Sequence, residues 1–312
     1  MGALSGLYNG GKSIYKNQVR RSNLSDKYSF IDRSAKAETV VIILAGYKQP
    51  LWPFVFPRLV RAMPEGVDVC VMSAGKSDPE LDEICRRNDW SYLATATNDV
   101  SLVQNVAISL HPEARTIVKI DEDMFVTEAT IKDCIAYYGE VKASGIADPA
   151  FVAPMINING VCYRPLLQRL GLLEDFEAKF GGARISTLGV AVTDDAEAAR
   201  WMWSKTAPLE ETVQKLKSSA LPGLMAPVQF SIGLIVFERA FWELIDCFPV
   251  KRHMLAMKKS TLGADEEYLC RMATFHARPV VICEHALAGH FSFGRQYAGM
   301  LNLLTEHPEY FN

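Results

Sequence analysis

Hydrophobic and polar positions follow a repeating order from about residue 39 onward. Apolar runs that predict buried strands cover residues 38–47, 67–75, 90–95 and 114–121. Amphipathic stretches between these runs predict helices over residues 51–63, 78–89, 101–111 and 127–139. Asp78 before Pro79 and Thr127 are the expected helix caps. This order of elements is typical of an α/β fold with a mostly parallel sheet flanked by helices.

The second half of the chain has a less regular pattern. Its apolar runs predict strands at residues 150–156, 230–238 and 278–289, with helices after the last two and another from residue 263. Residues 166–217 read as mostly helical and charged, interrupted by GGARIST. Trp201 and Trp203 in this stretch could stack on a sugar or pack in the core. We expect one domain over residues 39–312, with a helical insertion at about 166–225.

Composition excludes several classes of protein. The 312 residues are 49% hydrophobic and 22% charged with a net charge of −3, which excludes disorder of the whole chain and gives no support for nucleic-acid binding. The seven cysteines form no CxxC pair and stand mostly among apolar neighbours. They predict buried thiols rather than disulfides or a zinc site.

Residues 1–38 form a basic N-terminal arm, with seven lysines and arginines against three acidic residues. Such an arm could contact an anionic membrane or acceptor, or dock on the body as a solvated tail. No signal-peptide core is visible in the first 15 residues. Residues 218–237 are uncharged, but two prolines and several polar residues favour a loop and a strand over a membrane span. We expect a cytoplasmic protein, with the arm as a possible peripheral membrane contact.

Three adjacent carboxylates, Asp121, Glu122 and Asp123, follow directly on a predicted strand. They form either an acidic turn screened by water or part of a cation site. Strand alternation points Asp121 and Asp123 to one side and Glu122 away. Carboxylates two residues apart at a strand end can share Mg²⁺ or Mn²⁺ together with a ligand phosphate. Ligands of such sheets bind at the carboxyl ends of strands, which favours the cation site.

Other candidate positions lie further along the chain. The acids of GADEEYLCR could serve chemistry or simply favour a helix N-terminus. His290 follows the last predicted strand on a loop with Arg295, where a neutral imidazole could complete a metal shell. Gly233 interrupts an apolar run, which indicates close approach of a ligand or a packing constraint. The chain has no P-loop, HExxH, GxSxG or GxGxxG motif, which argues against several other enzyme classes.

Taken in order, residues 39–295 resemble a GT-A fold glycosyltransferase, closest to the large family-two group. VVIILAGYKQ is similar to the first strand and its donor-binding turn, which places Ala45, Gly46 and Tyr47 at the turn. VDVCVMSAGKSD resembles the second strand, although Ser73 replaces the acid that contacts uracil. Asn105 in LVQNVAI matches the Asn-containing helix, although Gln104 replaces the usual Arg.

The resemblance continues through the acidic and glycine motifs. IDEDMF matches the metal motif, which implies that Asp121 contacts the donor or the metal and that Asp123 binds the metal. QFSIGLIVFERAFW resembles the segment that meets the acceptor or the donor sugar, with Gly233 in its loop. GADEEYLCR places Asp265 on the catalytic acid, although Ala264 replaces the preceding Glu.

VVICEHALAGH resembles the strand ending in the histidine that closes the donor site, which selects His290 as the third metal ligand. Arg295 on the following loop is counted among the donor-binding residues.

The resemblance implies a transferase of polysaccharide biosynthesis that moves a sugar from a nucleotide-sugar donor to a glycan or lipid-linked acceptor. It implies Mn²⁺ or Mg²⁺ at Asp121, Asp123 and His290, with Asp265 as general base and inversion of the anomeric centre. A UDP-sugar is the expected donor, but Ser73 leaves the base open. Two alternatives remain: a retaining transferase or sugar nucleotidyltransferase, and a non-catalytic binding protein with this fold.

Overall fold

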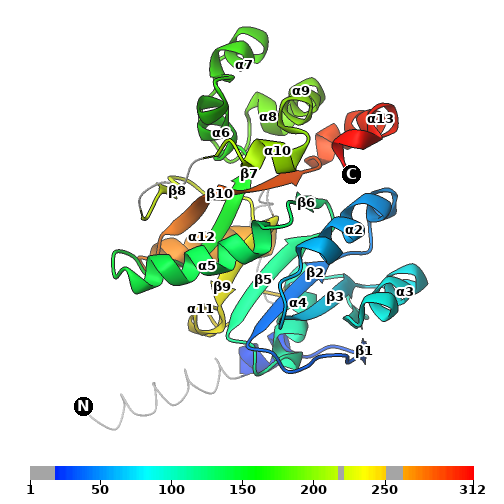
Figure 1. Cartoon of the computed structure of the whole chain (residues 1–312). Helices are drawn as coiled ribbons and strands as arrows, with labels where there is room; N and C mark the ends of the chain where they lie inside the picture. The colour runs from blue at the N-terminus through cyan, green and yellow to red at the C-terminus, as the bar shows by residue number, and fades with distance from the viewer. Residues whose placement is uncertain (1–17, 217–220, 251–262) are drawn as a thin grey trace.

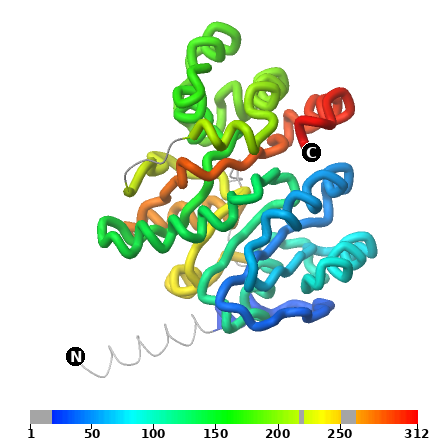
Figure 2. The backbone as a smooth tube through the Cα atoms, in the orientation of Figure 1, coloured from blue at the N-terminus to red at the C-terminus, as the bar shows by residue number. Residues whose placement is uncertain are grey.

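The computed structural model of the chain describes residues 18–216, 221–250 and 263–312. Within them a single mixed sheet carries helices on both faces (Figure 1), and Figure 2 shows the course of the backbone through it. The strands are β1 (Tyr28–Ile31), β2 (Thr39–Leu44), β3 (Asp68–Ala74), β4 (Ser91–Thr95), β5 (Thr116–Asp121), β6 (Met124–Val126), β7 (Phe151–Ile156), β8 (Leu224–Met225), β9 (Leu234–Glu238) and β10 (Val280–His290).

The α-helices of the described residues include the four that the pattern predicts in the first half of the chain, and those from residue 52 onward are given next in chain order. They are α2 (Trp52–Ala62), α3 (Pro79–Asn88), α4 (Val100–Leu110), α5 (Thr130–Ala143), α6 (Tyr163–Leu170), α7 (Leu173–Phe180), α8 (Ala191–Asp194), α9 (Ala196–Thr206), α10 (Leu209–Val213), α11 (Arg239–Leu244), α12 (Ala264–Phe275) and α13 (Tyr297–Glu306). Short 3₁₀ turns are η1 (Gln49–Leu51), η3 (Gly294–Gln296) and η4 (Pro308–Tyr310). Helices α2 and α5 cover one face of the sheet, and α4 and α12 lie behind it (Figure 1).

The sheet runs in the order β1, β4, β3, β2, β5, β9, β7, β10, β6, and β8 also pairs with β10. Strands β4, β3, β2 and β5 are parallel neighbours, whereas β9 lies antiparallel between β5 and β7. The expected α/β fold class, a mixed and mostly parallel sheet flanked by helices, is therefore confirmed. The carboxyl ends of β2, β3 and β5 meet at one edge, where ligands of such sheets bind.

One of the two expected helix caps is confirmed. The Asp78 carboxylate accepts a hydrogen bond from the Glu80 N–H at 3.0 Å, at the start of α3. Thr127 is not a cap: α5 begins at Thr130, and Ala129 stands before it without a side-chain bond. Thr127 instead forms a hydrogen bond within the turn: its N–H donates to the Thr130 hydroxyl at 2.9 Å. The prediction failed because a turn of two residues separates Thr127 from the helix.

Strand β6 is an element that the hydrophobic pattern did not reveal. It has three residues and follows the acidic turn directly. It pairs antiparallel with the end of β10, with Met124 opposite His290. The Phe291 N–H also donates to the Asp123 carbonyl at 2.9 Å. This pairing brings the acidic turn and His290 together, although they lie far apart in the sequence.

The stretch predicted to be mostly helical contains the helices α6 to α10, which lie at the upper end of the sheet together with α13 (Figure 1). Trp203 is fully buried, and its indole N–H donates to the His290 carbonyl at 3.0 Å. Trp201 packs edge-on against Phe176 and Phe180. Of the two alternatives for these tryptophans, the structure favours core packing.

The N-terminal arm lies outside the described residues as far as residue 17. Its later part contains β1, which pairs antiparallel with β4 at the edge of the sheet. Residues 217–220, at the start of the predicted loop, also lie outside the described part. All seven cysteines are buried and unpaired, as predicted. No helix within the described residues is long and apolar enough to cross a membrane.

Candidate active site

A cavity of about 320 Å³ opens at the carboxyl ends of β2, β3 and β5. Its lining includes five of the predicted site residues, namely Tyr47, Asp121, Asp123, Gly233 and His290. It also includes side chains that the sequence did not single out for this site, among them Lys48, Glu122, Glu266 and Ser292. The strand ends Leu44 and Ala74 complete the wall beside β5.

Asp123 is the most strongly paired acid of the cavity. Its Oδ2 atom lies 3.2 Å from His290 Nε2 and also contacts the Lys48 ammonium. The other ring nitrogen of His290, Nδ1, lies 3.2 Å from the Ile158 carbonyl oxygen, to which it can donate. Burial would raise the pKa of Asp123, but the charges of His290 and Lys48 outweigh burial and hold this pKa below its usual range. Asp123 is therefore ionised.

Asp121 is paired on one side only. Lys119, itself buried, donates to Asp121 Oδ2 at 2.7 Å and to the Ile232 carbonyl at 2.9 Å. The Oδ1 atom of Asp121 is buried and has no hydrogen-bond partner. Burial raises the pKa of Asp121 to about 6, and the neighbouring Lys119 charge offsets part of the effect. An unpaired, buried carboxylate oxygen is costly, so this atom is available to a ligand or cation.

Glu122 was expected to point away from Asp121 and Asp123, but it lines the same cavity, because β5 ends at Asp121 and strand alternation does not extend into the turn. Its carboxylate accepts the N–H groups of Gly46 and Tyr47 at 3.0 and 2.8 Å, and the indole N–H of Trp52 at 2.5 Å. Gly46 has φ +139°, a conformation that other residues rarely adopt. These hydrogen bonds to Glu122 hold the turn after β2 in place.

The Tyr47 side chain extends from this turn over the cavity wall. Its hydroxyl donates to the Ala74 carbonyl at 2.6 Å, and the residue is 54% exposed. The Lys76 ammonium lies 4.6 Å from the ring centroid. An anchored, half-open aromatic ring next to the carboxyl ends of β2 and β3 can stack on a flat ligand.

The acids at the start of α12 divide into two roles. Glu266 lines the cavity, and its Oε1 atom is buried without a partner. Burial, with a further contribution from the Asp265 charge, raises the pKa of Glu266 to about 8. Asp265 is not part of the cavity lining, and its Oδ2 atom accepts from the Gln104 amide at 2.8 Å. The residue that faces the cavity is thus the neighbour of the one the resemblance selects.

Five predicted donor-binding residues do not line the cavity, namely Ala45, Gly46, Ser73, Asn105 and Arg295. The buried Ser73 hydroxyl donates to the Ala45 carbonyl at 2.9 Å, so both residues support the turn from inside. Asn105 is fully buried, and its amide bonds the Phe248 carbonyl and the Trp242 indole at 2.9 and 3.0 Å. Arg295 points to solvent with 83% of its side chain exposed, 3.8 Å from Asp194.

The lysines of the site were missed, although the sequence carried a signal for one of them. Lys119 precedes Asp121 by two residues on the same strand, so both side chains leave the same face. A lysine in the middle of an apolar strand is rarely buried without a partner. Lys48 follows Tyr47 in the turn, and only the fold places it beside Asp123.

The donor set of Asp121, Asp123 and His290 suits a divalent cation in two respects. A histidine whose Nδ1 faces a backbone carbonyl presents Nε2 as a ligand, and the free Asp121 oxygen is a hard donor. The described residues contain no ready-made cluster of three such side chains around one point. Lys48 occupies the position next to Asp123 instead. The residues therefore fit a cation provided that Lys48 moves aside.

Among known proteins, only solved structures showed similarity to this chain. No protein-family model matches the chain, and no curated protein does. A mannosyltransferase from Pyrobaculum calidifontis, solved with GDP-Man and Mn²⁺, is 14% identical and aligns over 95% of this chain and 68% of its own, with a TM-score of 0.44. TarS from S. aureus is 14% identical over 57% of this chain and 42% of its own, with a TM-score of 0.31.

Proposed function

We propose that the chain is a glycosyltransferase that moves a sugar from a nucleotide-sugar donor to a hydroxyl of a glycan or lipid-linked acceptor. One observation carries the proposal: at the carboxyl edge of a parallel sheet, Asp121, Asp123, His290 and Glu266 converge on one cavity. Such a set can hold a diphosphate through cations and can remove a proton from a hydroxyl. Both tasks are needed for sugar transfer from a diphosphate leaving group.

The donor base would lie against the Tyr47 ring, on the turn that Glu122 holds rigid. Stacking on an aromatic ring tolerates any base, and Ser73 is turned inward, away from the cavity. Neither group selects uracil, so a UDP-sugar is one choice among several nucleotide sugars. Among the described residues, Lys48 is the one lysine or arginine in the lining of the cavity, so it is the side chain that would meet the diphosphate.

Asp121, Asp123 and His290 are the residues that would hold Mn²⁺ or Mg²⁺. When bound there, the cation would neutralise charge that develops on the departing diphosphate. The protein's own share is to supply one ionised carboxylate, Asp123, and one free carboxylate oxygen of Asp121. Lys48, released from Asp123, would add a second positive charge beside the leaving group.

We assign the general base to Glu266 rather than Asp265. An acceptor hydroxyl is a weak nucleophile, and a carboxylate must take its proton as it attacks. Glu266 faces the cavity with a free oxygen and has a pKa of about 8, which suits a base that works near neutral pH. Asp265, held by Gln104, would orient the start of α12. Direct attack aided by one such base inverts the anomeric centre, and inversion is part of the proposal.

A thermal-shift screen of nucleotide sugars with Mn²⁺ tests the proposal first, because a ligand that binds the native state raises Tm. A donor that raises Tm is then used to measure turnover of Glu266→Gln and Asp265→Asn, with Glu267→Gln as control. We expect Glu266→Gln to lose turnover by about 10²–10⁴-fold, as for removal of a general base.

Two outcomes of these experiments favour a different function. Retention of configuration in the product favours a retaining transferase, and release of a sugar 1-phosphate instead of a nucleoside diphosphate favours a nucleotidyltransferase. If no nucleotide sugar changes Tm, the proposal fails.

A further inference from the structure

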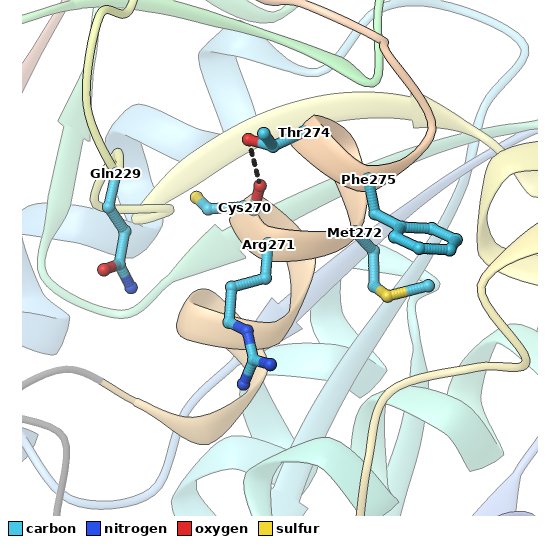
Figure 3. A pocket seen from close by; sticks show the side chains of 6 residues that line it. All are labelled: Gln229, Cys270, Arg271, Met272, Thr274 and Phe275. Carbon is cyan, nitrogen blue, oxygen red and sulfur yellow. Dashed lines mark hydrogen bonds between the residues drawn. The ribbon is translucent and has the colours of Figure 1, made fainter.

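A second hollow, of about 460 Å³, lies on the outer face of α12 (Figure 3). We call it the α12 groove. Its lining consists of Gln229, Cys270, Arg271, Met272, Thr274 and Phe275. Gln229 stands at one side of the helix and Phe275 at the other, with Arg271 between them (Figure 3).

The α12 groove begins next to the active-site cavity. Glu266 lines the cavity and Cys270 lines the groove, and four residues along a helix make about one turn, roughly 6 Å. On the facing segment Ser231 lines the cavity and Gln229 lines the groove, two residues apart, or roughly 7 Å in an extended chain. Two separate segments therefore lead from the carboxylates into the groove.

The groups of the groove that can recognise a ligand are an exposed aromatic ring, an exposed guanidinium and a buried amide nitrogen. Phe275 is 78% exposed, the largest fraction among the big hydrophobic side chains of the described residues. The Arg271 side chain is 63% exposed, with Glu267 at 3.8 Å. The Gln229 amide nitrogen is buried and has no partner. An unpaired buried amide indicates a ligand surface, and the exposed ring and guanidinium line the same hollow.

The remaining polar groups of the groove are already bonded within the protein. The Thr274 hydroxyl donates to the Cys270 carbonyl at 3.2 Å (Figure 3), and the Cys270 thiol contacts the Phe230 backbone at 3.4 Å. Recognition therefore falls to Phe275, Arg271 and Gln229. A sugar ring matches this set, since its C–H face packs on an aromatic ring and its hydroxyl oxygens accept from guanidinium and amide groups.

We propose that the α12 groove binds the acceptor glycan, with one ring on Phe275 and with oxygens of the chain bonded by Arg271 and Gln229. This inference rests on the proposed function, because the cavity is where the acceptor hydroxyl must react. A glycan that lies along the groove places its end about one helical turn from Glu266. The groove thus serves as the subsite that holds the body of the acceptor while its terminal hydroxyl enters the cavity.

The test measures binding of oligosaccharides of two to six sugars, each in a neutral and a uronate-containing form, by calorimetry without any donor. The affinity of an oligosaccharide that binds the full wild-type chain is then measured for Phe275→Ala, Arg271→Gln and Phe275→Trp. Ile146→Ala, which alters another exposed apolar side chain at 61% exposure, is the matched control. Thermal stabilisation by the nucleotide sugar measures the donor site separately.

We expect Phe275→Ala to weaken oligosaccharide binding by about tenfold, the size of one lost aromatic contact. Phe275→Trp and Ile146→Ala should bind as the wild type does, and Arg271→Gln should lose affinity most for the uronate-containing form. In transfer assays the same variants should raise the acceptor KM more than they lower kcat.

The proposal is overturned if no oligosaccharide binds the wild-type chain, or if Phe275→Ala and Arg271→Gln bind it with unchanged affinity. If no nucleotide sugar stabilises the wild-type chain, the result counts against the proposed function alone. In that case, binding of an oligosaccharide that depends on Phe275 still supports the groove as a glycan site.

Discussion

The Nε2 atom of His290 lies 3.2 Å from the Oδ2 atom of Asp123, at the junction of β10 and the short strand β6. The Lys48 ammonium contacts the same carboxylate oxygen. A histidine and an aspartate at this separation can share one cation, and in the free chain the lysine is paired with the aspartate. Metal and Lys48 must therefore compete for Asp123.

Lys48→Met should strengthen binding of Mn²⁺ to the free chain, by on the order of tenfold, because an adjacent ammonium no longer competes for the carboxylate. The same variant should bind the nucleotide sugar more weakly, since one positive charge near the diphosphate is lost. Titration of free Mn²⁺ by electron paramagnetic resonance measures the first effect, and thermal shift measures the second. Lys142→Met, which removes a lysine paired with Glu238 on the far helix α5, is the control. Equal Mn²⁺ affinity in both variants would show that Lys48 does not occupy the cation position.

Glu122→Gln should destabilise the chain by about 2–3 kcal/mol, because bonds from three N–H groups to a charged acceptor are weakened together. The turn carrying Gly46 and Tyr47 would loosen, so the thermal shift produced by the nucleotide sugar should also fall. Urea unfolding and the thermal-shift assay measure the two effects. Glu128→Gln, at an exposed position with only a long contact to Arg61, should change neither quantity. A loss of stability with full donor binding would limit Glu122 to a structural role.

Most of the longer strands and helices, and the edge of the sheet at which the cavity opens, were predictable because they follow from local patterns. Apolar runs of β2, β3 and β5 and the amphipathic helices between them are visible in hydrophobic periodicity. The rule that ligands bind at carboxyl strand ends then placed Asp121 and Asp123 in the cavity. Strand alternation did not place Glu122 correctly, because this residue lies in the turn after β5 and lines the same cavity as its neighbours.

The partners of these acids were not predictable, because they come from distant segments. Lys48 reaches Asp123 only once β2 and β5 are neighbours, and His290 reaches it through β6, which is too short to show a period. The choice between Asp265 and Glu266 depends on how α12 is rotated about its axis. Three consecutive acids contain no information on that rotation.

Asn105→Ala should reduce stability by about 2–4 kcal/mol while the thermal shift caused by the nucleotide sugar stays the same. The Asn105 amide oxygen accepts from the Trp242 indole and from the Phe248 N–H, both at 3.0 Å, so its removal leaves buried donors unpaired. The amide lies inside the protein and outside the cavity lining. Urea unfolding and donor titration on the same preparation test both statements. A weaker donor response at full stability would return Asn105 to the donor site that the resemblance implies.

Glu266→Gln should make the chain more stable than the wild type at high pH, with a gap that closes as the pH falls. In the folded protein the Glu266 pKa is about 8, whereas an unfolded chain has the ordinary value near 4.5. Between these two values the unfolded chain loses the proton first, so the wild type loses stability as the pH rises through this window. The side chain of the Glu266→Gln variant does not titrate, so the variant keeps the stability that the wild type loses. This loss amounts to roughly 2–4 kcal/mol. Urea unfolding at pH 5 and pH 8.5 measures the gap, with Glu267→Gln as the neighbouring control. A gap that is the same at both pH values would mean that Glu266 is ionised in the folded chain, and it would remove the raised pKa from the case for Glu266 as the base.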